Sequence, residues 1–301
     1  MNANMIRFLL LSLCCISAAV AAPVSLKDGD MVVLLGDTFV EREGNYGYIE
    51  STITASNPGK TIRFRNLGWS GDTPNAQARS YFGPPAEGQQ RLKGNLELVK
   101  PTVVFCAYGS AIAAEGEAGI GKFVADYGKL IDLIYQTTKS QIVLVSPAPA
   151  EAKGAVKPLM EVRNTQLAAV AGAVKKLAEE RKLGYIDLLT PLTKVIADSK
   201  TNLTTNGLHF TEAGYQQIAP VVAAALVELP KPASVVSAKL RTAIREKNEL
   251  FFNRWRPQNE IYLFGSRKHE QGNNGVEIPM FDPLIEAKEK EIVGLQTQPQ
   301  S

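Results

Sequence analysis

The sequence is poor in cysteine and histidine, with three cysteines and two histidines among 301 residues. Cys14 and Cys15 lie in an apolar N-terminal segment, and Cys106 stands alone in a later apolar run. The rest of the chain therefore has no pair of cysteines for an intramolecular disulfide. Cys106 and two histidines that are distant in sequence are too few ligands for a typical zinc site. We expect no disulfide framework and no metal, and we interpret Cys106 as a buried, inert thiol.

Two further absences exclude whole classes of function. The chain has no Gly-x-x-x-x-Gly-Lys-Ser/Thr loop and no Gly-x-Gly-x-x-Gly turn after a strand, so nothing indicates a nucleotide cofactor. The formal net charge of +3 is close to neutral for this length, and no basic stripe alternates with aromatic residues. The sequence therefore predicts neither a cofactor nor a nucleic-acid partner.

The longest apolar run stands at the N-terminus. Arg7 is the only charge in residues 1–22, an apolar run extends from Phe8 to Val20, and Ala19-Val20-Ala21 has the small-x-small form of a signal-peptidase site. The alternative is a membrane anchor, but the run is short for a span and ends in Ala-Ala-Pro. We predict a cleavable signal peptide at 1–22, a secreted or periplasmic protein, and no membrane span after cleavage.

Short β-type runs alternate with helical patterns after this segment. The predicted strands are 31–35, 61–66, 102–107, 142–146 and 184–187, and the predicted helices are 48–55, 92–99, 123–135, 160–182 and 211–227. This alternation predicts an α/β fold, a doubly wound parallel sheet of about five strands with helices on both faces. Ligands of such sheets bind beyond the carboxyl ends of the strands. The residues just after each strand are therefore the candidates for a site.

The alternation stops near Pro230. Residues 233–255 look helical and charged, 256–282 irregular, and a short charged helix follows to Val293, with 296–301 disordered. We predict a domain at 23–229 and an extension at 230–301 that is too short and polar for a core of its own. The extension then packs on the domain or on a protein partner.

The extension also carries a cluster of charged side chains around aromatic residues. Its members are Arg254, Arg256, Arg267, Lys268, His269 and Glu270. The cluster either adds groups to the site or forms a solvated strip that docks through Trp255 and Phe264. We favour the solvated strip.

Four segments bring chemically useful residues to strand ends. The first strand ends in Gly36-Asp37-Thr38, where a sharp turn presents Thr38 at the top of the sheet. The second leads to Gly71, which lacks a Cβ and can offer its N–H closely to a substrate oxyanion. Ala111 follows the third strand, and His209 stands just before the last predicted helix.

These segments resemble the conserved blocks of the SGNH, or GDSL-type, ester-hydrolase family in order and spacing over 31–226. The second block and the stretch Gly-Leu-His-Phe-Thr-Glu-Ala-Gly-Tyr are specific, whereas the Gly-Asp-Thr block is a variant. The phrases 36–50, 66–73, 255–257 and 264–273 resemble a subgroup seen in planctomycete-type bacteria. The resemblance implies a flavodoxin-like three-layer fold and ester hydrolysis.

The family's functional residues carry over as follows. The nucleophilic serine falls on Thr38, and the glycine of the oxyanion hole on Gly71. The oxyanion-hole asparagine falls on Ala111, whose side chain has no donor. The general-base histidine falls on His209, and the carboxylate that precedes it by three residues falls on Asn206.

The three replacements weaken the expected chemistry. Thr38 keeps a hydroxyl, but its methyl group restricts χ1. Asn206 cannot stabilise an imidazolium, and the same change in a serine protease costs about 10⁴ in turnover. One lost oxyanion donor costs about 10²–10³. A carboxylate from elsewhere would have to orient His209, and the candidates are Asp187, Asp198 and Glu212.

Three more residues are expected at the pocket, namely Asp37, Tyr108 and Glu115. Glu115 and Glu117 could form a glycosidase pair, but nothing fixes their spacing. The favoured hypothesis is an exported hydrolase of esters, such as acyl or acetyl esters of extracellular glycans. The alternative is an inactive protein of the same fold that binds carbohydrate or serves as a scaffold for a protein partner.

Overall fold

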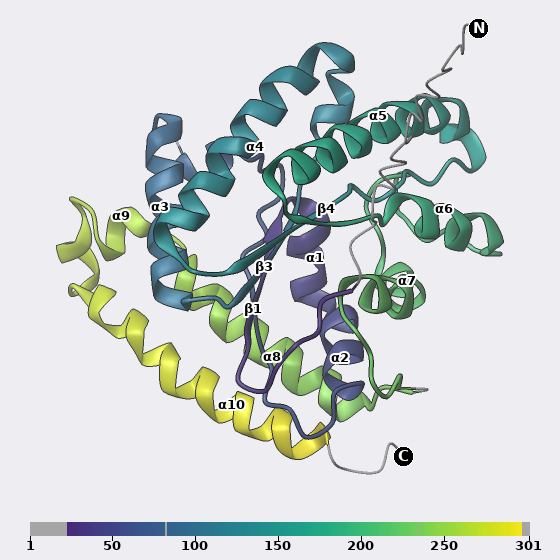
Figure 1. Cartoon of the computed structure of the whole chain (residues 1–301). Coiled ribbons are helices and arrows are strands. Elements are labelled where there is room, and N and C mark those ends of the chain that lie inside the picture. The colour runs from purple at the N-terminus through teal and green to yellow at the C-terminus, as the bar shows by residue number, and fades with distance from the viewer. Residues whose placement is uncertain (1–22, 82, 234, 297–301) are drawn as a thin grey trace, which may run out of the picture.

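The computed structural model describes residues 23–81, 83–233 and 235–296. In this part of the chain five parallel strands form one sheet in the order β2-β1-β3-β4-β5 (Figure 1). They are β1 (Met31–Gly36), β2 (Arg63–Asn66), β3 (Val103–Ala107), β4 (Gln141–Val145) and β5 (Gly184–Ile186). The chain runs from β1 to the edge strand β2 and then back past β1 to β3. This reversal places the topological switch point between the carboxyl ends of β1 and β3.

Helices cover both faces of the sheet, as predicted. One face carries α1 (Thr38–Tyr46), α2 (Tyr48–Ala55), α6 (Leu189–Asp198) and α7 (Glu212–Leu226). The other face carries α3 (Pro85–Val99), α4 (Glu117–Thr137) and α5 (Lys157–Arg181). Along β1, Val33 and Leu35 pack into one hydrophobic cluster, and Val32 and Leu34 pack into the other. Both faces of the strand are buried, which explains its continuous apolar sequence.

The structure differs from the sequence prediction in three helices. α1 and α6 were not expected, and α3 begins at Pro85 rather than at 92. The prediction for α7 is confirmed at its start, because the Thr211 hydroxyl accepts a hydrogen bond from the Gly214 N–H at 3.0 Å. Cys106 is buried in β3, and burial raises the pKa of its thiol.

The C-terminal extension forms α8 (Ala238–Trp255), α9 (Glu260–Leu263) and α10 (Phe281–Gln296), with short 3₁₀ turns at 268–271 and 274–280. α8 and α10 pack together at the β2 end of the sheet (Figure 1). Lys247 of α8 donates to the Phe64 carbonyl of β2 at 3.1 Å and to the buried Glu50 carboxylate of α2 at 2.6 Å. A charged side chain thus covers the open edge of the sheet.

The ends of the chain bear on two sequence predictions. The predicted signal peptide at 1–22 lies outside the described residues, as does 297–301. Gln296 was expected to be disordered, but it ends α10, is buried, and donates to the Thr54 carbonyl at 3.2 Å. No helix in the described ranges is both long enough and apolar enough to cross a membrane.

Glu43 of α1 has a buried acidic side chain. Its Oε1 accepts the N–H groups of Ile49 and Glu50 at 2.7 and 3.1 Å, and its Oε2 is buried without a partner. Burial raises the pKa of Glu43 to about 8, and the negative charge of Glu50 acts in the same direction, although the two N–H donors oppose it. The folded protein therefore holds this proton at neutral pH.

Glu43 predicts a pH dependence of stability. Because its folded-state pKa of about 8 exceeds its ordinary value of 4.5, the contribution of Glu43 is fully present below about pH 4.5 and is lost as the pH rises to about 8. In Glu43→Gln, which mimics the protonated carboxyl, urea unfolding at pH 5 to 8 should show a weaker loss of stability. The exposed Glu228→Gln serves as the control, and the same pH profile in all three proteins would contradict the prediction.

Candidate active site

The turn after β1 places Thr38 at the carboxyl end of a central strand. A Cβ at Gly36 would lie 2.4 Å from the Ala107 carbonyl oxygen and 2.6 Å from a methyl of Val40, so only glycine fits there. Asp37 is the N-cap of α1, and its Oδ1 accepts the Phe39 N–H at 3.1 Å. Thr38 is therefore the first residue of a helix that starts directly from the strand.

Asp37 also ties this turn to the neighbouring strand. Its side chain is only 4 % exposed, and its Oδ2 accepts the Ser110 N–H from the loop after β3 at 3.3 Å. Burial raises the pKa of Asp37 to about 6, although the N–H donors of Phe39 and Ser110 oppose the change. One carboxyl group thus fixes the two loops at the switch point.

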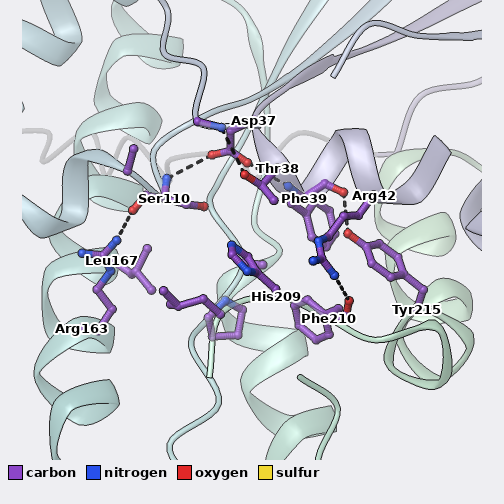
Figure 2. A pocket seen from close by; sticks show the side chains of 15 residues that line it. Asp37, Thr38, Phe39, Arg42, Ser110, Arg163, Leu167, His209, Phe210 and Tyr215 are labelled. Atoms are coloured by element: carbon purple, nitrogen blue, oxygen red, sulfur yellow. Dashed lines mark hydrogen bonds between the residues drawn. The ribbon is translucent and has the colours of Figure 1, made fainter. Parts of the chain in front are cut away.

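A pocket of about 210 Å³ opens beside this turn (Figure 2). Five of the residues predicted from the sequence line it, namely Asp37, Thr38, Gly71, Ala111 and His209. They come from the ends of β1, β2 and β3 and from the loop before α7, so segments distant in sequence meet where the topology predicts a site.

Two residues that were expected at the pocket do not line it. Tyr108 points into the core, where its hydroxyl donates to Asp72 at 3.2 Å and its ring meets Tyr127 edge-on. Glu115 is exposed and follows the 3₁₀ turn Ile112–Ala114, which carries it away from the pocket. The alternation of side chains along β3 continues one residue beyond the strand and so turns Tyr108 inward.

Thr38 and Gly71 are in direct contact. Gly71 has a φ of 73°, and its N–H donates to the Thr38 hydroxyl oxygen at 3.2 Å. The predicted oxyanion donor and the predicted nucleophile therefore lie side by side in the pocket lining. A substrate carbonyl would compete with this hydroxyl for the Gly71 N–H.

The loop that carries Gly71 is held from inside by Arg79. This side chain is fully buried, its Nε donates to Asp72 at 2.7 Å, and its Nη2 donates to the Leu67 carbonyl at 2.7 Å. A buried guanidinium requires such partners because an unpaired charge would be costly in the interior. The pair therefore fixes both ends of the 67–72 loop.

The same loop is held from outside by the extension. The Arg256 guanidinium lies 3.4 Å from the centre of the Trp69 ring and pairs with Glu41 at 3.4 Å. Glu41 in turn accepts the Ser70 N–H, and Trp255 packs edge-on against Trp69. The extension thus supports the loop of the site without lining the pocket.

The remaining charged residues of the extension lie away from the pocket. Arg254 pairs with Asp282 at 2.8 Å, and Arg267 pairs with Glu270 at the surface at 2.7 Å. Phe264 is 55 % exposed, so it does not anchor the extension as we expected, whereas Trp255 is buried.

The loop before α7 presents His209. Buried Glu151 holds the start of the loop, because its carboxylate accepts the N–H groups of Leu203 and Thr204 and the Thr204 hydroxyl at 2.7–3.0 Å. Burial disfavours the charge of Glu151, but these donors outweigh it and lower the pKa of the carboxyl. The loop is thereby fixed by a carboxylate that bonds to Leu203 and Thr204 rather than to the imidazole.

Asn206 determines which nitrogen of His209 carries the proton. The Asn206 Oδ1 accepts the N–H groups of Leu208 and His209 at 3.1 and 3.0 Å, which leaves its Nδ2 facing the ring, 3.3 Å from His209 Nδ1. An amide NH₂ only donates, so we assign Nδ1 as the acceptor and Nε2 as the protonated nitrogen. Burial lowers the pKa of His209, and the positive charge of Arg42 lowers it further. The neutral ring therefore offers a donor to the pocket.

None of the three carboxylates proposed to orient His209 contacts it. Asp187 accepts the Thr190 N–H at 3.2 Å, Asp198 pairs with Lys194, and Glu212 pairs with Arg241 at 3.0 Å. Across the described ranges, no hydrogen bond joins His209 to the Thr38 hydroxyl. No group of three His, Cys, Asp or Glu side chains that could hold a metal occurs in the same ranges.

A family model described as "GDSL-like Lipase/Acylhydrolase family" matches residues 34–217. The chain belongs to this family. The match spans β1 to α7 and so contains every predicted site residue. No curated protein sequence gives a significant match to the chain.

Solved structures show the same fold. The acetylxylan esterase Axe2 from Geobacillus stearothermophilus is 18% identical, with a TM-score of 0.52 over 67% of this chain and 96% of that chain. A lipase/acylhydrolase from Enterococcus faecalis is 19% identical, with a TM-score of 0.50 over 68% and 100%. A gut microbial diltiazem-metabolizing enzyme is 18% identical with a TM-score of 0.53, and the match covers 69% of this chain but only 49% of that chain.

Two arginines of this GDSL-like pocket were missed by sequence reasoning. Arg42 lies one helical turn after Thr38 on α1, so both side chains share a face of that helix. Arg163 lies one turn before Leu167 on α5, and both line the pocket. A helix predicted directly after Thr38 would have revealed Arg42, whereas no sequence signal placed the start of α5 at the pocket.

The contact between Asn206 and His209 predicts the titration of the imidazole. In the wild type, NMR titration should give His209 a pKa below 6.5 and ring ¹⁵N shifts of the Nε2-protonated form. In Asn206→Asp, a carboxylate beside the ring should raise this pKa by about one to three pH units and move the proton to Nδ1. The exposed Asn202→Asp adds the same charge to the same loop and should have little effect. Equal titration in all three proteins would refute the assignment.

Proposed function

We propose that this protein is an exported ester hydrolase that acts on acyl or acetyl esters of extracellular glycans, with Thr38 as nucleophile. The observation that carries the proposal is the convergence of Thr38, Gly71 and His209 on one pocket at the switch point of a GDSL-like fold. The pocket volume of about 210 Å³ suits a short acyl group or one sugar ring better than a long chain. Axe2, one of the structural neighbours, is an acetylxylan esterase.

The proposed reaction assigns one role to each residue. The Thr38 hydroxyl oxygen attacks the ester carbonyl carbon. The Gly71 N–H then donates its hydrogen bond to the developing oxyanion instead of to that hydroxyl. The hydroxyl proton passes to His209 Nε2, which accepts it only in the tautomer that carries a proton on Nδ1. Asn206 disfavours this tautomer, so the reaction proceeds through a minor population and is slow. The imidazolium then gives its Nε2 proton to the alcohol oxygen as the ester C–O bond breaks, and a water molecule, deprotonated in the same way, hydrolyses the acyl group from Thr38.

Two parts of the proposal rest on sequence. Export rests on the signal-like residues 1–22, and membership of a subgroup seen in planctomycete-type bacteria rests on the Gly-Asp-Thr block and the phrases that accompany it. Both remain predictions.

Hydrolysis provides the direct test. The purified protein should release nitrophenol from nitrophenyl acetate and acetate from acetylated xylo-oligosaccharides, and both Thr38→Ala and His209→Ala should abolish turnover. Asn206→Asp should raise kcat by about 10²-fold or more, since the reverse change in a serine protease lowers it by about 10⁴. Equal rates in the wild type, Thr38→Ala and His209→Ala would contradict the proposal.

A second candidate function is ligand binding without turnover, and the Asn206–His209 contact favours it because a donor imidazole is not a base. Ala111, which lacks a side-chain donor at the oxyanion position, points the same way. In this case the wild type is inert, and the triple variant Thr38→Ser, Ala111→Asn, Asn206→Asp should gain measurable esterase activity. Wild-type hydrolysis that disappears in Thr38→Ala would exclude this candidate.

A further inference from the structure

Two arginines stand on opposite walls of the pocket, with His209 between them (Figure 2). The Arg42 Nη1 donates to the Phe210 carbonyl at 3.2 Å, and the Arg163 Nη2 donates to the Ser110 carbonyl at 2.5 Å. Throughout the described ranges neither guanidinium forms an ion pair. Both charges are therefore left uncompensated beside the pocket.

Most of the donor capacity of these side chains is unused. A guanidinium carries five N–H donors, and one bond to a neutral carbonyl satisfies a single donor. The Arg163 Nε is buried and has no hydrogen-bond partner. Buried donors are normally satisfied, so an orphan beside a pocket points to a partner that arrives with the ligand.

The only carboxyl group of the lining does not neutralise them. Asp37 directs its oxygens at the N–H groups of Phe39 and Ser110 and pairs with neither arginine. With two guanidinium groups and one carboxylate, the pocket carries an excess of one positive charge. The protonated Nε2 of His209 adds a neutral donor, and the remaining walls are largely apolar.

We propose that this pocket recognises a carboxylate, carried by the sugar unit that bears the ester, as in a uronic acid. Arginine presents paired N–H groups that match the two oxygens of a carboxylate, and a single negative charge balances the excess of the pocket. The inference rests on the proposed function for the sugar ester, but carboxylate binding itself does not require turnover. The other source of a carboxylate is the free acid that hydrolysis releases.

Calorimetric titration of the wild type with glucuronate, glucose, acetate and inorganic phosphate tests the proposal. Glucuronate should bind at least about tenfold more tightly than glucose, because a hydrogen-bonded charge contributes that much or more, and its affinity should fall with added salt. If acetate bound as tightly as glucuronate, the site would be assigned to the released acid, and the proposal of a sugar acid would be overturned. If phosphate bound more tightly than glucuronate, or if glucuronate and glucose bound equally, the proposal of carboxylate recognition would be overturned.

Variants locate the binding on the two arginines. Arg42→Gln and Arg163→Gln should each weaken glucuronate about tenfold and leave glucose unchanged. Arg42→Lys and Arg163→Lys keep the positive charge but not the paired N–H groups of a guanidinium, so they should lose less affinity for glucuronate than the glutamine variants. Arg63→Gln removes the same charge at the amino end of β2, far from the pocket, and should bind normally. An equal loss in Arg63→Gln would overturn the assignment, and circular dichroism confirms that each variant is folded.

Binding and turnover fail separately in these experiments. If the protein bound glucuronate but showed no Thr38-dependent hydrolysis, the proposed carboxylate site would stand and the proposed esterase activity would be contradicted. Thr38-dependent hydrolysis without selective glucuronate binding would do the reverse.

Discussion

The buried carboxyl of Asp37 is the joint on which the pocket depends. It caps α1 through Phe39 and holds the loop after β3 through Ser110, so one side chain fixes the position of Thr38 and of the opposite wall. This is possible only because β1 and β3 are adjacent and parallel, with Gly36 opposite Ala107. The raised pKa of Asp37 shows that burial costs more than these two N–H groups return. Asp37 therefore holds the two loops together although burial disfavours its ionised form.

The extension belongs to the same folded unit as the sheet. Lys247 satisfies the Phe64 carbonyl at the edge of β2 and pairs with Glu50, both in the interior. Eight residues later on the same helix, Trp255 meets Trp69, and Arg256 covers that ring. α8 thus seals the edge strand with one part and supports the Gly71 loop with another. Removal of the extension would expose buried charges as well as apolar surface.

The sequence predicted the sheet well because both faces of each central strand are buried, which leaves continuous apolar runs. It failed at α1 because this helix buries Val40 and the carboxyl of Glu43, so no apolar stripe marks it. Arg42 was missed for the same reason. Tyr108 was misplaced because the end of a strand says where a residue lies along the chain but not toward which face its side chain turns. Gly71 and His209 reached the pocket as their blocks predicted, whereas Arg163 depended on where α5 begins.

Most polar groups aimed into the pocket donate hydrogen bonds. Arg42, Arg163 and the Gly71 N–H are donors by nature, and His209 becomes one because Asn206 occupies its Nδ1. An aspartate at 206 would turn the same imidazole into an acceptor and so into a base. The residue at position 206 therefore decides which nitrogen of His209 carries the proton. A pocket of donors is complementary to a ligand rich in oxygen acceptors, and in the proposed reaction the donor form of His209 hinders removal of the proton from the Thr38 hydroxyl.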